Sequence, residues 1–166
     1  MEDGRGAWLE RVMTDHEAAL LRLCFAYLGE LPLAEDAVQE TFVKAYKGYE
    51  RFRGESGETT WLARIAINTC KDIRRSNWFR RVDRRVALDS LPEGSEPFTE
   101  RDDTLTRAVM VLKPKLREVV LLHDWQGLTA EATAEALGIS RSTMYNRLDK
   151  AHRLLRKELE AWYHDR

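Results

Sequence analysis

The stretch LTAEATAEALGISRSTMYNRL, residues 128–148, predicts two short helices separated by a tight turn. Thr129 is positioned to cap the first helix, and Leu128 before it can act as a hydrophobic staple. Gly138 supplies the left-handed residue that ends a helix, and Ser140 can cap the next one. An apolar seam at helical spacing runs along that second helix, formed by Met144, Leu148, Ala151 and Leu155. This arrangement is typical of a helix-turn-helix.

The other face of the second predicted helix carries polar side chains at its start and basic ones along its flank. Short polar groups near a helix N-terminus suit the reading of base edges, and a basic flank suits contact with phosphates. An ordinary helical hairpin with a solvated basic face is the alternative. The small Ala134, Gly138 and the basic second helix together favour DNA binding. The candidate DNA-contacting residues are Arg141, Ser142, Tyr145, Asn146 and Lys150.

Charge is segregated along the chain, although the formal net charge is only −1. Residues 71–85 carry seven Lys or Arg against two Asp, and residues 138–157 carry six Lys or Arg against one Asp. Between them, residues 86–103 carry one Arg against six Asp or Glu. Because charges more than about 10 Å apart are screened at moderate salt, each block acts locally. The small net charge therefore does not exclude a nucleic-acid partner.

Helical apolar spacing continues through most of the remaining chain, and no convincing pair of strands interrupts it. Helices are expected over residues 8–28 and about 34–50. A third helix is expected to follow, with Thr59 or Thr60 as its cap. We therefore predict an all-α fold with two small helical domains joined by a flexible acidic linker, the C-terminal one a helix-turn-helix.

The boundary between the two predicted domains is marked by a change of composition. Pro92 and Pro97 stand in a segment that also holds a glycine, two serines and the acidic excess, which is typical of a linker. The sequence predicts an N-terminal domain over residues 8–80, a linker over residues 81–103 and a C-terminal domain over residues 104–163.

The third predicted helix has an apolar side and a basic side when its residues are placed at about 100° intervals. The core side is expected to hold Leu62, Ile65, Ala66, Thr69 and Ile73. The opposite side holds Arg64, Asn68, Lys71 and Arg75. Such a face ordinarily meets solvent, but an asparagine within a basic row can both donate to and accept from a base edge. Trp61 lies at the border and favours the core, whereas Trp78 and Phe79 suit either DNA contact or packing.

Several function classes find no support in the sequence. Cys24 and Cys70 stand apart in apolar helical contexts, which favours buried thiols over a redox pair, a disulfide or a zinc site. No Gly-rich phosphate loop, metal-ligand cluster or nucleophile–base pair occurs, so we expect no enzyme activity, metal, cofactor or small-molecule substrate. No apolar run reaches about 20 residues and no signal peptide is recognisable, so we expect a cytoplasmic protein without direct membrane insertion.

Three segments together resemble a known family. They are AEDAVQETFVKAY (34–46), FRGESGETTWLARIAINTCKDIRR (52–75) and the segment from LKPKLREVV to LLRKEL (112–159). Over roughly residues 15–160 the chain resembles extracytoplasmic-function (ECF) sigma factors, the compact two-domain class of bacterial transcription initiation factors. It departs from the usual family pattern where TAEATA (129–134) replaces SYEEIA and STMYNR (142–147) replaces a GTVKSR-like segment.

The resemblance implies that the second helix docks on core RNA polymerase, at the β′ clamp helices, rather than on DNA. Asp36, Gln39 and Glu40 would form the polar docking face, and Val38 and Phe42 would belong to the core. Acids early in a helix also stabilise its dipole, so Asp36 and Glu40 are compatible with both roles. The polymerase β subunit and an anti-sigma factor are further implied partners.

Promoter DNA is the other implied partner. By resemblance, the third helix and the loop before it recognise the minus-10 element through Arg64, Asn68, Lys71, Arg74 and Arg75, and the helix-turn-helix recognises the minus-35 element. The implied function is a sigma factor that directs core RNA polymerase to specific promoters and assists promoter opening. The alternative is a stand-alone helix-turn-helix regulator whose N-terminal bundle serves dimerisation or sensing.

Overall fold

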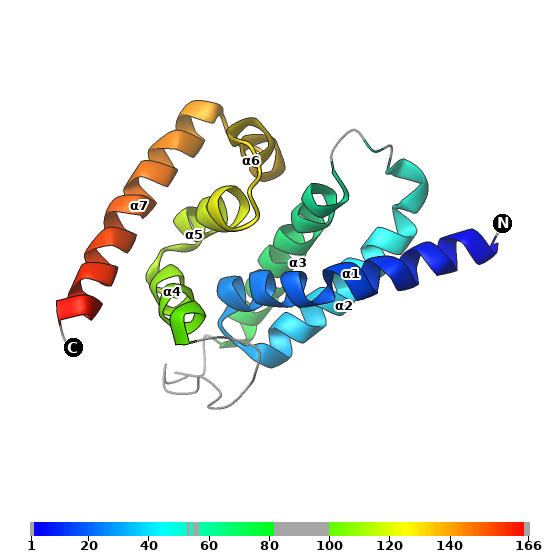
Figure 1. Cartoon of the computed structure of the whole chain (residues 1–166), viewed down its shortest axis with the longest axis horizontal. Coiled ribbons are helices and arrows are strands. Elements are labelled where there is room, and N and C mark those ends of the chain that lie inside the picture. Colours follow the sequence, from blue (N-terminus) through cyan, green and yellow to red (C-terminus); the bar gives the residue numbers. More distant parts are fainter. Residues whose placement is uncertain (1, 53, 55–56, 82–99, 165–166) are drawn as a thin grey trace. The chain divides into compact units, whose positions relative to one another are not determined.

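The computed structural model describes residues 2–52, 54, 57–81 and 100–164 (Figure 1). Every regular element within those ranges is helical, and the chain divides into two compact units, Met1–Leu91 and Pro92–Arg166. The prediction of an all-α, two-domain fold is therefore confirmed. Most of the predicted linker, residues 82–99, lies outside the described residues, and the domain boundaries stay predictions.

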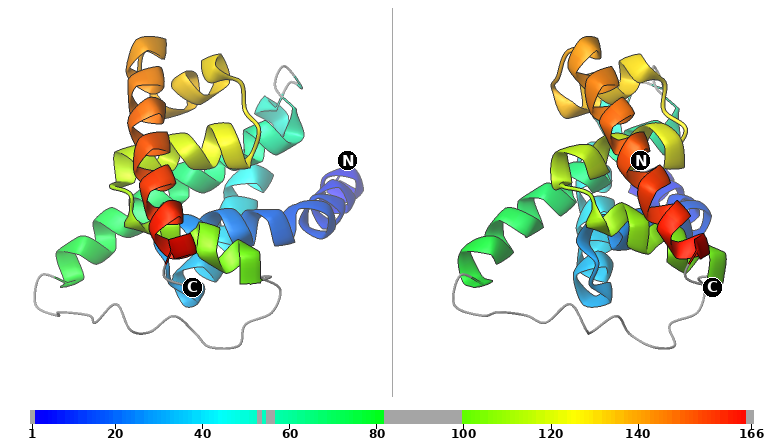
Figure 2. Two further views of the ribbon diagram at one scale, coloured as in Figure 1. Left: turned by 60° about the vertical axis from the view of Figure 1, so that its left-hand side comes forward. Right: turned by 90° about the vertical axis from the view of Figure 1, so that its left-hand side faces the viewer.

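The first unit is a bundle of three long helices that pack against one another. Their ribbons, coloured blue to green, can be followed in Figure 2. They are α1 (Glu2–Leu28), α2 (Leu31–Lys47) and α3 (Glu58–Arg81), with a short 3-10 turn, η1 (Tyr49–Arg51), after α2. Each of the three helices contacts the other two. The buried side chains at their meeting faces include Leu23, Cys24, Tyr27, Val38, Phe42, Leu62, Ile67 and Cys70. Both cysteines are free and fully buried, as the sequence predicts.

The first two helices begin earlier than the apolar pattern predicts. Helix α1 begins at Glu2 rather than near residue 8, and it ends where Gly29 adopts a left-handed φ of 74°. Helix α2 begins at Leu31 because Pro32 fits the first turn, where a backbone N–H has no helical partner. It ends at Lys47, and the residues predicted to continue it form η1 instead.

The predicted cap of α3 is wrong. The helix begins at Glu58, so both Thr59 and Thr60 lie inside its first turn. The carbonyl of Gly57 accepts the N–H of Trp61 at 3.0 Å, which makes glycine the residue before the helix. Glycine is tolerated at this position almost as well as a hydroxyl side chain.

The buried arc of α3 is wider than predicted. Leu62, Ala66 and Thr69 are buried as expected, whereas Ile65 and Ile73 are only half-buried. Ala63, Ile67 and Cys70 are also fully buried. Helix α3 packs against both α1 and α2, so two adjoining faces of the helix are buried rather than a single face.

The second unit consists of short helices held by one long helix. The elements are α4 (Glu100–Val111), α5 (Pro114–Val120), a π-helical turn η2 (Leu121–Trp125), α6 (Ala130–Leu137) and α7 (Arg141–His164). Helix α7 contacts α4, α5 and α6. Its long apolar seam is therefore shared among all three neighbours.

The helix-turn-helix forms with the predicted caps. The Thr129 hydroxyl accepts the N–H of Ala132 at 3.0 Å, and the Ser140 hydroxyl accepts the N–H of Thr143 at 3.1 Å. Gly138 lies between the helices in the left-handed conformation, with φ 63°. The four predicted seam residues of α7 and the staple residue are all buried, namely Met144, Leu148, Ala151, Leu155 and Leu128.

The junction between α4 and α5 is closed by one side chain. The guanidinium of Arg117 donates to the carbonyl of Val109 at 3.2 Å, to that of Leu112 at 3.0 Å and to that of Met110. The last carbonyls of a helix have no partner within it, so they need donors from elsewhere. Arg117 supplies those donors for the end of α4.

Candidate functional site

The predicted docking residues lie on the exposed face of α2. Asp36, Gln39 and Glu40 are all exposed, whereas Val38 and Phe42 of the same helix are buried at 4% and 5% exposure. The predicted division of this helix into a core face and a polar face is therefore present. The acidic residues contribute no side chain to the core.

The sequence analysis missed one apolar residue on the same face. The side chain of Val43 is 45% exposed and follows Gln39 and Glu40 by about one helical turn. Val43 does not fit the helical spacing of the buried residues of α2, and this mismatch could have identified it as exposed from the sequence. The face therefore combines two carboxylates, an amide and a branched apolar group.

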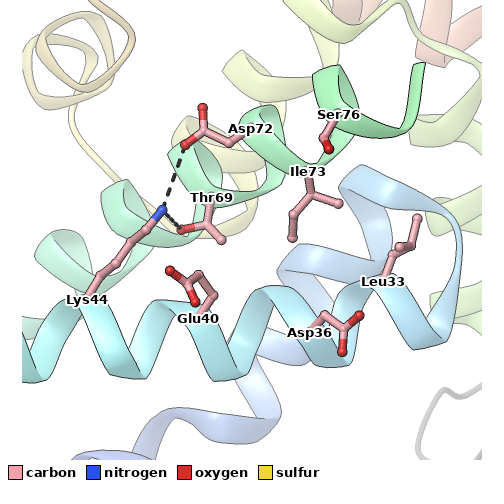
Figure 3. A pocket seen from close by; sticks show the side chains of 8 residues that line it. All are labelled: Leu33, Asp36, Glu40, Lys44, Thr69, Asp72, Ile73 and Ser76. Atoms are coloured by element: carbon pink, nitrogen blue, oxygen red, sulfur yellow. Dashed lines mark hydrogen bonds and ion pairs between the residues drawn. The ribbon is translucent and has the colours of Figure 1, made fainter. Parts of the chain in front are cut away.

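A groove of about 480 Å³ separates this face of α2 from α3 (Figure 3). Its carboxylates come from both helices: Asp36 and Glu40 from α2, and Asp72 from α3. Lys44 crosses the groove, with its Nζ donating to Thr69 Oγ1 at 3.1 Å and lying 3.8 Å from a carboxylate oxygen of Asp72. The remaining lining residues are Leu33, Ile73 and Ser76. The lysine thus offsets one of the three acids.

The predicted minus-10 residues all lie outside the buried arc of α3. Asn68 and Arg75 are exposed, and the other three are half-buried, namely Arg64, Lys71 and Arg74. A helix holds such a row rigidly, since its backbone hydrogen bonds are internal. The side chains of Trp78 and Phe79 lie outside the described residues.

Four aromatic rings surround the start of α3. Trp61 stacks on Phe52 with ring centroids 4.6 Å apart and lies 6.2 Å from Trp8. Trp8 in turn lies 4.7 Å from Tyr49, centroid to centroid. Trp61 is half-buried in this cluster, in keeping with its predicted border position. Offset and tilted aromatic pairs of this kind stabilise a contact by about 0.5–1.5 kcal/mol beyond burial.

The predicted minus-35 residues share the exposed side of α7. Arg141, Ser142, Asn146 and Lys150 are exposed, and Tyr145 is 45% exposed. Beside them lies a groove of about 680 Å³ between α7 and the start of α5. Its lining residues are Lys113, Pro114, Lys115, Leu116, Thr143, Asn146, Arg147 and Lys150.

This groove is basic, with four cations and no carboxylate among its lining residues. Two of the cations, Lys113 and Lys115, belong to the turn before α5 and to its first residues, and the sequence analysis did not single them out. The Lys-Pro-Lys triplet was the only local signal. Its contact with α7 depends on the fold, because more than 25 residues separate the two sides.

A carboxylate flanked by two histidines joins α7 to η2. Asp124 Oδ2 lies 2.5 Å from His152 Nε2, and Asp124 Oδ1 lies 2.8 Å from His123 Nδ1. Across the described part of the chain, no group of three or more His, Cys, Asp or Glu is arranged to hold a metal ion. The described helices include none long and apolar enough to cross a membrane.

Comparison with known proteins divides the chain in the same way. The family model for sigma-70 region 2 matches residues 12–80, and that for sigma-70 region 4 matches residues 102–155. A helical bundle that matches region 2, followed by a helix-turn-helix that matches region 4, defines a sigma-70-class transcription initiation factor.

The similar curated proteins are RNA polymerase sigma factors. The chain is 32% identical to the sigma-E factor of Streptomyces antibioticus, over 97% of this chain and 89% of that protein. It is 31% identical to sigma factor YlaC of Bacillus subtilis, over 91% of each. The chain belongs to the ECF sigma factor family, and it directs RNA polymerase in transcription initiation. Sigma factors are non-catalytic initiation factors whose regions 2 and 4 bind core polymerase and promoter DNA.

Solved structures share the fold. The sigma factor RpoE of Bartonella quintana, in complex with the anti-sigma factor NepR, matches with a TM-score of 0.73 at 23% identity, over 91% of this chain and 96% of that one. CnrH, in complex with the cytosolic domain of CnrY, matches with a TM-score of 0.66 at 22% identity, over 92% and 88%. At these identities the likeness describes the fold alone.

Proposed function

We propose that the exposed face of α2 is the surface by which this sigma factor docks on the β′ clamp helices of core RNA polymerase. Asp36, Gln39 and Glu40 are exposed on it, and Val43 adds an exposed apolar group one turn further along the helix. Carboxylates in excess over cations attract a basic partner surface, which raises the association rate as well as the affinity. The β subunit is expected to provide a second contact.

The basic side of α3 is the proposed reader of the minus-10 element. Arg64, Lys71, Arg74 and Arg75 supply charge for backbone phosphates, and the exposed Asn68 supplies the donor and acceptor that a base edge requires. Extruding a base from a duplex costs a few kcal/mol, so a protein surface that holds it assists opening.

The helix-turn-helix is the proposed reader of the minus-35 element. Arg141, Ser142, Tyr145 and Asn146 occupy the first two turns of α7, the part of a recognition helix that meets base edges. Lys150 and the basic groove beside it are suited to the phosphates that flank those bases.

These roles divide the chain as the sequence predicts. Residues 8–80 would hold the polymerase and the minus-10 element, residues 104–163 the minus-35 element, and residues 81–103 would connect them. Such a protein acts in the cytoplasm, where bacterial chromosomes and polymerase are. An anti-sigma factor is a further proposed partner, because similar folds have been solved in complexes that include one.

One observation carries the docking proposal: Asp36 and Glu40 are exposed on α2, whereas Val38 and Phe42 of the same helix are buried. The test is retention of core RNA polymerase by the immobilised chain. We expect the Asp36→Lys/Glu40→Lys variant to lose about tenfold or more in retention, since like charges would face a basic partner. The matched control is Glu35→Lys/Glu50→Lys, which makes the same change of charge at exposed positions outside the proposed set.

Equal retention of the parent and both variants would remove α2 from the docking surface. Failure of the parent to retain polymerase, together with tight specific binding to duplex DNA, would favour the stand-alone regulator instead. Promoter-specific transcripts from genomic template, made only when the chain is added to core polymerase, would complete the test.

A further inference from the structure

Glu58, the first residue of α3, is held by two side chains of α1. Arg11 Nη2 donates to Oε1 at 2.7 Å and Arg11 Nη1 to Oε2 at 3.2 Å, while His16 Nε2 lies 2.9 Å from Oε2. The Glu58 side chain is 23% exposed and that of His16 is 16% exposed. The carboxylate of Glu58 therefore contacts two residues that precede it in the sequence by 42 and 47 positions.

The contacts of Glu58 with Arg11 and His16 are not needed for an acidic residue to stabilise a helix N-terminus. An acidic residue in the first turn stabilises the helix dipole without any partner from another helix. Here the Arg11 guanidinium, with help from His16, lowers the pKa of Glu58 to about 2. A two-pronged arginine–carboxylate pair also has a fixed geometry, which restricts how α3 can rotate about its own axis.

Glu58 anchors the start of α3 to α1, and the two glycines that precede it offer no side chain for such a contact. The preceding Gly57 has no side chain, and a Cβ at its position would meet nothing within 4 Å. Gly54 adopts a left-handed φ of 71° and is equally open. One turn further along α3, Trp61 packs against Phe52 and against Trp8, which lies one turn before Arg11 on α1.

The orientation of the start of α3 fixes where the basic row points. Arg64, Asn68 and Lys71 follow Glu58 by six, ten and thirteen residues on one continuous helix. A rotation at Glu58 would therefore turn all three side chains by the same angle. Arg11 precedes residue 12, where the match to region 2 begins, so this anchor includes a residue outside the matched segment.

We propose that Glu58, through its contacts with Arg11 and His16, is a positioning residue for the DNA-reading side of α3. The inference rests on the proposed minus-10 role of that side. Glu58 itself touches no base in this scheme. Its role is to hold Asn68 and its basic neighbours in the orientation in which a base at the minus-10 element can be distinguished.

The test measures discrimination rather than activity. Core polymerase carrying the full chain is given a mapped promoter and a copy with one changed non-template base in the minus-10 element, and the ratio of transcripts is recorded. Two variants break the link from opposite sides, Arg11→Gln/His16→Gln and Glu58→Gln. The control is Asp15→Asn, because Asp15 also pairs with Arg11, at 3.3 Å, but lies on α1 itself.

We expect the transcript ratio to fall about fivefold in both link variants, equivalent to ~1 kcal/mol at 1.4 kcal/mol per factor of ten. Combining them should add little, since both remove the same contact. Asp15→Asn should keep the parent ratio. Thermal midpoints of all variants are measured first, and transcription is assayed well below the lowest of them.

A merely structural role gives a different result. If Glu58 only stabilises the bundle, total transcripts fall in step with the thermal midpoint while the ratio stays at the parent value, and the inference is overturned. If the parent gives no promoter-specific transcripts, the proposed function fails and the inference fails with it. A parent that discriminates beside a Glu58→Gln variant that discriminates equally well refutes the inference alone.

Discussion

The basic groove beside α7 leads to a quantitative prediction about salt. Lys113 and Lys115 face the groove from α5 and its preceding turn, opposite Arg147 and Lys150 of α7. If both α5-side lysines contact phosphates, Lys113→Gln/Lys115→Gln removes two phosphate contacts. Each contact contributes about 0.9 to the slope of log K against log salt, so the slope should become shallower by about 1.8.

The effect is large enough to measure without knowing the promoter sequence. Between about 50 and 200 mM salt, a slope change of about 1.8 reduces the affinity advantage of the parent roughly twelvefold. Binding of the full chain to a short non-specific duplex is followed by fluorescence anisotropy across this range. Lys47→Gln, an exposed lysine on α2, is the control. Parallel salt slopes for the parent and the double variant would refute a phosphate role for this groove.

Two further predictions concern stability. Met144→Ala should destabilise the second unit by about 2–5 kcal/mol because the Met144 side chain is fully buried. Tyr145→Ala, at the exposed neighbouring position, should change stability by less than about 0.5 kcal/mol. Thermal unfolding followed by circular dichroism compares the two variants. Glu58, whose pKa is lowered from 4.5 to about 2, stabilises the fold fully above pH 4.5 and loses that contribution as the pH falls towards 2. The difference in unfolding free energy between the parent and Glu58→Gln should therefore be constant near neutral pH and shrink in acid, and a difference that grew on acidification would contradict the assignment.

The helix-turn-helix was predictable from sequence because its signals are local. Thr129 and Ser140 cap helices that begin one residue later, and Gly138 takes the left-handed conformation that it alone adopts without strain. The buried seam of α7 repeats at helical spacing, so composition and period agree. Where local propensity and tertiary packing favour the same structure, the sequence is enough.

The start of α3 was mispredicted for the opposite reason. Thr59 and Thr60 have suitable side chains for a cap, but the helix begins one residue earlier, where Glu58 meets Arg11 and His16. A contact across more than 40 residues leaves no trace in a local pattern. The same holds for Lys113 and Lys115, whose groove exists only once α5 packs on α7.

The sequence therefore predicted which helix face carries the candidate site residues, but not which residues of other helices lie beside them. Helical periodicity alone separates the exposed Asp36 and Glu40 from the buried Val38 and Phe42. It cannot reveal that Lys44 spans to Thr69 and Asp72, because the register between α2 and α3 is set by packing.

The Arg117 junction has a consequence for how this protein tolerates mutation. Since its guanidinium serves the carbonyls of Val109, Met110 and Leu112, the turn between α4 and α5 needs no glycine to end the first helix. The sequence requirement therefore falls on Arg117 inside α5 rather than on the turn, because the compact ammonium of a lysine cannot reproduce the planar fork of the guanidinium. In a saturation mutagenesis scan, position 117 should tolerate few substitutions, whereas position 113 should tolerate many. If Lys113 contacts phosphate as proposed, substitutions there would change DNA affinity without unfolding the second unit.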